Sequence, residues 1–76
     1  MRRYNGYLIE GRAALMHPYD PSHYPAGTIL EPDRAGSIIE LGRVELPSFT
    51  MAMSELAEWF GLELCRIAVD ECFLSR

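Results

Sequence analysis

Apolar and polar positions alternate along the first part of the chain, as they do in a β-strand with one buried face. Over residues 4–16, Tyr7 and Ile9 fall on one face while Glu10 and Arg12 fall on the other. This alternation predicts a first strand over residues 4–16.

Turn-forming residues divide the next part of the chain. Residues 17–27 contain three prolines, and each proline removes an amide donor and restricts the residue before it, so a loop is expected there. A short second strand is expected over 28–31, a turn over 32–36 and a third strand over 37–46. Pro47 then ends the strands.

Beyond Pro47, large apolar residues recur with the spacing of one helix face. They are Met53, Leu56, Phe60, Leu64, Ile67 and Leu74. The spacing predicts a helix over about residues 50–72, capped by Ser48 or Thr50, whose large apolar side chains cover the sheet.

Gly61 leaves a second interpretation open, in which it ends the helix as a C-cap and residues 62–74 form a strand. Small residues favour one continuous helix, because they follow each other at helical spacing along one flank. They are Ser54, Ala57, Gly61, Cys65, Ala68 and Cys72. Glycine in mid-helix costs about 0.5–1 kcal/mol relative to alanine, and this flank gives it a use, since another backbone can approach it closely.

These elements predict an α+β fold, in which a three-stranded antiparallel sheet (β-β-β-α) is covered by one long C-terminal helix. Residues 1–76 form a single small domain, with the sheet over 4–46. A domain of 76 residues buries only about 60% of its unfolded surface, so oligomerisation is a common source of added stability.

The predicted helix carries large apolar groups on its charged side as well, which one sheet cannot cover. We therefore expect a non-enzymatic protein-interaction module, most simply a homodimer, with about 800 Å² buried per partner. The expected interface residues are Met51, Trp59, Gly61, Leu62, Cys65, Val69 and Phe73.

The stretch SFTMAMSELAEWFGLELCRIAVDE resembles the C-terminal part of small uncharacterised bacterial proteins in which a short antiparallel sheet precedes one helix. The likeness covers about residues 48–71. Matching positions are Phe49, Thr50, Ala57, Gly61, Leu62, Glu63, Leu64, Arg66, Val69 and Asp70. The resemblance implies a sheet-plus-helix fold, and it brings no activity or cofactor with it.

Composition narrows the classes of function. All seven basic residues are arginine, which excludes enzymes that need a lysine base, a Schiff-base lysine or a P-loop lysine. The net charge of −4 disfavours nucleic acid as the main partner. A nucleic-acid-binding domain is nevertheless the main alternative, using sheet aromatics and arginines. Its candidates are Tyr4, Tyr7, Tyr19 and Tyr24 with Arg2, Arg3, Arg12 and Arg43.

No signal peptide or membrane span is predicted, so a cytoplasmic location is expected.

Groups able to carry chemistry are few. His17, Asp20 and His23 share one segment but match no standard metal spacing, so no metal or other cofactor is predicted. On a continuous helix Cys65 and Cys72 lie roughly 10 Å apart, beyond the reach of a disulfide, and are interpreted as packing residues. No nucleophile–base pair is visible, so no catalytic residue is predicted.

Overall fold

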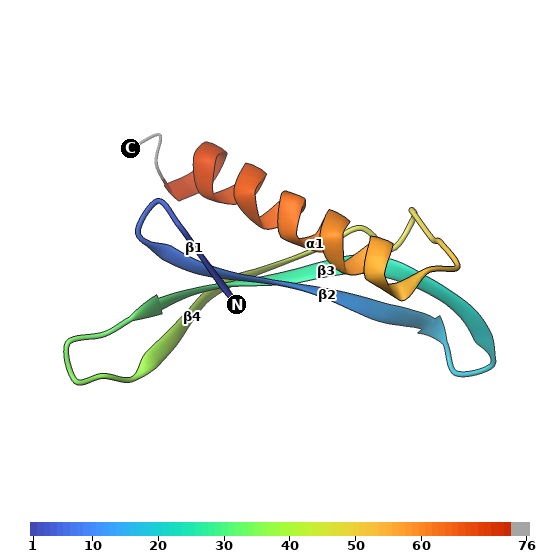
Figure 1. Ribbon diagram of the computed structural model, residues 1–76, viewed down its shortest axis with the longest axis horizontal. Coiled ribbons are helices and arrows are strands. Elements are labelled where there is room, and N and C mark those ends of the chain that lie inside the picture. The colour runs from blue at the N-terminus through green and yellow to red at the C-terminus, as the bar shows by residue number, and fades with distance from the viewer. Residues whose placement is uncertain (74–76) are drawn as a thin grey trace.

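A computed structural model describes residues 1–73, and for Phe73 the backbone alone. In this part of the chain a four-stranded antiparallel sheet carries one helix on one face (Figure 1). The elements are β1 (Arg2–Tyr4), β2 (Tyr7–His17), β3 (Asp20–Pro32), β4 (Ile38–Glu45), α1 (Ser54–Ala68) and a π-helical turn (Val69–Phe73). The predicted α+β class and the single C-terminal helix are confirmed, and the predicted number of strands is wrong. The strands follow each other in the order β1-β2-β3-β4.

The additional strand arises at Asn5–Gly6, where the chain reverses between β1 and β2. Both residues have positive φ, 50° at Asn5 and 89° at Gly6, as a type I′ turn requires. Tyr4 then pairs with Tyr7. The dipeptide Asn-Gly between two tyrosines was therefore the sequence signal for a hairpin. The alternation of apolar and polar residues, taken alone, had indicated one continuous strand across this position.

The loop predicted over 17–27 is also wrong, because β3 begins at Asp20 and pairs with β2 along most of this segment. A strand can contain proline at some positions, because successive residues of an antiparallel strand direct their backbone N–H and C=O groups to alternate sides. The N–H and C=O of His23 bond Met51, on the side away from β2. Pro25 points its nitrogen to that same side, so it removes no hydrogen bond from the β2–β3 ladder. Pro21 lies where the register shifts between the pairs Leu15–His23 and His17–Asp20, outside the regular ladder.

The turn between β3 and β4 agrees with the sequence. Asp33 accepts hydrogen bonds at Oδ1 from the backbone N–H groups of Ala35 and Ser37, at 2.8 and 2.9 Å. Gly36 has a φ of 86°, a left-handed conformation that favours glycine. Strand β4 then lies within the predicted range of 37–46.

The helix passes through Gly61 without a break and continues as a π-helical turn to Phe73. The continuous helix is confirmed, and the alternative strand over 62–74 is wrong for its described residues. The helix begins at Ser54 rather than near residue 50, and its N-cap position is Met53, with no side-chain capping bond. The predicted caps, Ser48 and Thr50, therefore lie before the helix.

Helix α1 packs on the sheet through its small residues. A Cβ added to Gly61 would overlap the backbone carbonyl of Ala26, and one added to Gly11 would overlap the backbone of Glu58. Two backbones approach this closely only where side chains are absent. The prediction that the large apolar sector faces the sheet was wrong, because the flank of small residues takes that position.

The core between helix and sheet is correspondingly small. Its fully buried centre consists of Ile9, Ile29, Cys65 and Val69. Half-buried side chains surround it, namely Tyr4, Tyr7, Val44, Leu62 and Ala68. Many of the largest apolar side chains are left outside this core.

Candidate interaction surface

Helix α1 covers only part of the sheet face on which it lies. It packs mainly against β2 and β3 and far less against β4 (Figure 1). A helix with its side chains is about 10–12 Å wide and strands are about 4.8 Å apart, so one helix covers roughly two strands. The helix therefore does not cover the part of the sheet face beside it, toward β4 and residues 46–53.

Residues 46–53 fold back along β3 and form the second wall of that space. The backbone N–H of Leu46 donates to the carbonyl oxygen of Pro25 at 2.9 Å. Met51 and His23 exchange two backbone hydrogen bonds of 2.8 Å. These bonds hold an irregular segment against the sheet and set its apolar side chains opposite the flank of α1.

An apolar groove lies between α1 and this segment, with a volume of about 390 Å³. Its lining is almost entirely apolar, with a carboxylate at one point. We call it the apolar groove, and its lining residues are Pro25, Leu46, Phe49, Trp59, Phe60, Glu63, Leu64 and Ile67. It falls in the size range of sites that hold a ligand or an inserted side chain.

Three aromatic rings shape one end of the apolar groove. Phe60 meets Phe49 edge-to-face with centroids 5.2 Å apart, and it meets Trp59 in the same way at 5.0 Å. Such edge-to-face pairs orient rings that would otherwise be free to turn. Trp59 nevertheless remains 53% exposed, so its indole is held by neighbours while its surface stays open to solvent.

Large apolar side chains extend the groove along the outside of α1. Met53 is 60% exposed, Leu56 42% and Ile67 57%. We call these three residues together with Trp59 the outer stripe. Most of the outer stripe belongs to the sector that the sequence assigned to the sheet, and it now forms the uncovered side of the helix.

The residues predicted to meet a partner are divided by the fold. Trp59 is exposed beside the apolar groove, as the prediction requires. Gly61, Cys65 and Val69 are buried against the protein's own sheet, so for these three the prediction was wrong.

The other predicted interface residues are less accessible than Trp59, or are not described. Leu62 is half-buried and faces Gly11 on the sheet. Met51 is half-buried and bonded to β3 through its backbone. The side chain of Phe73 lies outside the described part of the structure.

Leu46 and Phe49 are groove residues that the sequence analysis missed. The signal available was weak, since two apolar residues flank Pro47 and Ser48 in a segment without periodicity. A prediction from periodicity finds residues within one regular element, whereas these two are brought to α1 by the return of the chain along β3.

A polar network fastens the C-terminal end of the helix to β1. The Tyr4 hydroxyl contacts both carboxylate oxygens of Asp70, at 3.0 and 2.8 Å. The hydrogen bond to Asp70 raises the pKa of Tyr4 above its ordinary value of 10.0. Arg66 lies over the Tyr4 ring at 5.8 Å and pairs with Glu63 at 2.7 Å. These contacts explain why a strand as short as β1 stays on the edge of the sheet.

Cys65 is a structural thiol beneath the centre of the sheet. Its Sγ points to the carbonyl oxygens of Glu10 and Thr28, both at 3.7 Å. Burial raises the pKa of the Cys65 thiol, which suppresses the thiolate that a nucleophile needs. Cys72 is a free and exposed thiol at the helix end.

Two of the residues considered above as metal ligands, His17 and Asp20, have other roles in the hairpin between β2 and β3. His17 Nδ1 accepts a hydrogen bond from the N–H of Tyr19 at 3.2 Å, and Asp20 Oδ1 accepts one from Ser22 at 2.9 Å. Within residues 1–73, no three histidine, cysteine or acidic side chains lie close enough together to hold a metal ion.

The tyrosines of the nucleic-acid alternative do not form one platform. Tyr4 and Tyr7 pack beside the core on the helix-covered face, whereas Tyr24 lies opposite Ala14 on the other face and Tyr19 is at a hairpin tip. Stacking of successive bases needs aromatics on a common surface.

In the described range, the helix is too short and too polar to cross a membrane.

Comparison with known proteins adds no relative, since no family model, no curated protein and no solved structure matches this chain. The resemblance of residues 48–71 to small bacterial proteins stays a prediction.

Proposed function

We propose that this protein is a non-enzymatic interaction module that associates with a second copy of itself. The association uses the apolar groove and the outer stripe together. The observation that carries the proposal is the exposure of large apolar side chains on one continuous side of the molecule. They are Leu46, Phe49, Met53, Leu56, Trp59 and Ile67, each between 39% and 60% exposed.

The size of this surface matches a stable protein contact. Large side chains carry on the order of 200 Å² each, so six that are half exposed present about 600 Å². Half-buried Phe60 and Leu64 and a polar rim add to this, which approaches the 800 Å² or so per partner of a standard interface. An exposed apolar surface of this extent on a soluble domain marks an interaction site.

The charges at this surface are compatible with burial. Glu63 lines the apolar groove, and its carboxylate is bonded to Arg66 of the same chain at 2.7 Å. A partner that covers the groove therefore does not have to neutralise an isolated carboxylate, which would be costly. A second copy supplies the same apolar groups, and a twofold dimer is the commonest closed arrangement.

The test is the mass of the protein in solution across a wide range of concentration, measured by sedimentation equilibrium. We expect a species of twice 8.6 kDa that dissociates on dilution. The Ile67→Glu variant should remain monomeric, because it places a charge beside the apolar groove. The matched control is Ile38→Glu, since Ile38 is 53% exposed against 57% for Ile67 and starts β4 away from the groove.

Two results would contradict the proposal. One is an 8.6 kDa species at every concentration, which would exclude a second copy as the partner. The other is a dimer that survives Ile67→Glu but is lost in Ile38→Glu, which would place the contact at β4. Circular dichroism of both variants establishes that each is folded.

A further inference from the structure

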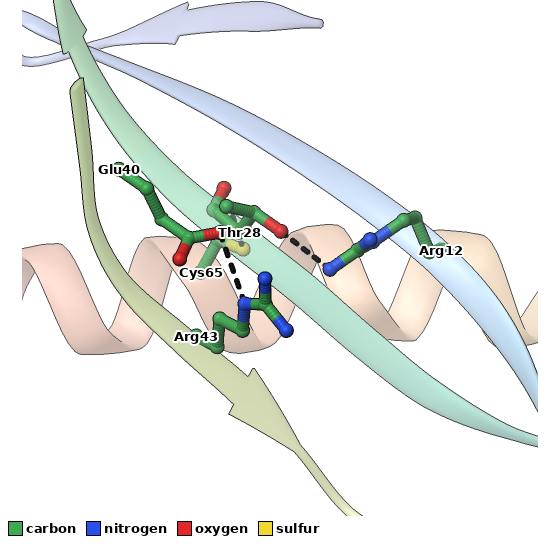
Figure 2. Close-up of polar contacts among 5 residues, drawn as sticks. All are labelled: Arg12, Thr28, Glu40, Arg43 and Cys65. Atoms are coloured by element: carbon green, nitrogen blue, oxygen red, sulfur yellow. Dashed lines mark hydrogen bonds and ion pairs between the residues drawn. The ribbon is translucent and has the colours of Figure 1, made fainter.

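The face of the sheet opposite α1 carries two arginines that point toward one another across β3. Arg12 comes from β2 and Arg43 from β4 (Figure 2). Thr28 of β3 lies directly opposite Arg43, and Ala26 lies opposite Arg12. The register therefore brings two positive side chains to one point, although 31 positions separate them in the sequence.

Arg12 is held in place by Thr28. Its Nη2 donates to Thr28 Oγ1 at 2.5 Å, so the side chain reaches along the sheet from the level of Ala26 to that of Thr28. Thr28 is 6% exposed and Ala26 9%, although α1 lies on the other face. The stems of long side chains can cover a sheet in this way while their charged ends stay accessible.

The two guanidinium groups retain unused donors. Arg43 bonds Glu40 through Nε alone, at 2.9 Å, which leaves both of its Nη groups. Arg12 forms no ion pair with any carboxylate of residues 1–73, and its one hydrogen bond to a side chain uses Nη2. Both arginines border a hollow of about 240 Å³ whose floor includes Ala14 and Ala26.

We propose that this hollow binds a carboxylate between Arg12 and Arg43. Guanidinium groups present planar pairs of N–H donors that match the two oxygens of a carboxylate. The Thr28 oxygen already accepts from Arg12, so its hydroxyl hydrogen is available to the same anion. Arg12 has no carboxylate partner within residues 1–73, and Arg43 uses only Nε for Glu40, so an anion that bridges the two guanidinium groups offsets their mutual repulsion.

The surroundings favour a singly charged anion over a doubly charged one. Glu45 borders the hollow and Glu40 lies beside Arg43, and both repel a phosphate dianion about twice as strongly as a carboxylate. A small organic acid and an acidic side chain of a polypeptide share the same chemistry. The site lies on the opposite side of the sheet from the apolar groove and does not depend on self-association.

The experiment is an NMR titration of the ¹⁵N-labelled protein at constant ionic strength, with signals of backbone amides and of arginine Nε–H groups. The probes are sodium acetate, the peptide acetyl-Glu-Glu-Glu-amide and sodium phosphate, with sodium chloride as the reference. We expect saturable shifts around Arg12, Thr28 and Arg43 with acetate and with the peptide. Tighter binding of the peptide identifies an acidic polypeptide as the source, and equal binding identifies a small acid.

Variants separate a specific site from general charge effects. Arg12→Gln and Arg43→Gln should each weaken binding about tenfold or more, because each removes a charge-assisted hydrogen bond. Arg34→Gln is the matched control, since Arg34 is an exposed arginine in the turn between β3 and β4, and it should bind as the unmodified protein does. Thr28→Val keeps the shape of the side chain and should weaken binding by a smaller factor.

Three outcomes would overturn the inference. Shifts that rise linearly and equal those in chloride show screening without a site. Equal losses in Arg34→Gln and Arg12→Gln show an effect of net charge. Tighter binding of phosphate than of acetate or peptide contradicts the assignment to a carboxylate.

Discussion

The two long sides of helix α1 differ in the size of their residues more than in their polarity. The side on the sheet carries Ala57, Gly61 and Cys65, all buried. The opposite side carries Leu56, Trp59 and Ile67, which are about half exposed. Hydrophobicity alone would place the large side chains inside. The comparison teaches that the sheet accepts the side that lets two backbones approach, and that the larger residues are then left for another contact.

The largest effect on stability is expected when one carbon is added to the side of α1 that faces the sheet. Gly61→Ala should lower the free energy of unfolding by about 3 kcal/mol or more, because the new Cβ overlaps the carbonyl of Ala26. Ile67→Ala removes a far larger group from the outer side and should cost within about 0.5 kcal/mol for the monomer. Urea unfolding at low protein concentration measures both. A larger loss for Ile67→Ala would contradict the assignment of the two sides.

A smaller effect is expected at Cys65, which fills the space beneath Gly27 on the same side. Cys65→Ala should cost about 1–2 kcal/mol at neutral pH through the void it leaves. Cys72→Ala is the control, because Cys72 is exposed, and it should leave unfolding unchanged. Urea unfolding of both variants measures this difference.

The thiol also predicts a dependence on pH. Burial raises the pKa of Cys65 above its ordinary value of 9.0. The contribution of the protonated thiol to the free energy of unfolding is therefore complete below pH 9.0, and it is lost as pH rises through the folded-state pKa. Cys65→Ala should therefore show a shallower decrease in stability above pH 9.0 than the unmodified protein. The same slope in both proteins would show that Cys65 is not the group that titrates.

The smallest effect concerns the attachment of the helix end to β1. Tyr4→Phe removes the hydrogen bonds to Asp70 and should lower the midpoint of thermal unfolding slightly. The pKa of Tyr4 is raised, so this contribution is present below pH 10.0 and is lost as pH rises through the folded-state pKa. The difference between the two proteins should therefore shrink above pH 10.0. An unchanged difference would show that the hydroxyl contributes without titrating.

The sequence was most informative where a signal lies within one element. The helical spacing of small residues indicated that the chain continues through Gly61, and Asp33 with Gly36 marked the turn before β4. It was least informative about β3, because three prolines in residues 17–27 argue for a loop unless the hydrogen-bonding side of each is known. That side depends on which strands are neighbours, which no local pattern specifies.

For the candidate surface, the exposure of Trp59 agreed with the sequence because large apolar residues lie on more than one side of the helix and the sheet covers only one of them. The rest of the apolar groove depends on Leu46 and Phe49, which approach α1 only when residues 46–53 return along β3.

The amino-acid order was sufficient for the class of fold, the continuous helix and the surplus of apolar surface, since these follow from the periodicity of the apolar and small residues. Which side of the helix meets the sheet depended on three-dimensional packing, because Gly11 and Gly61 have to coincide with backbone on the facing element. The same holds for Arg12 and Arg43, whose meeting depends on the register of three strands. The register between two strands depends on both strands together, so the residue pattern within one strand does not specify it.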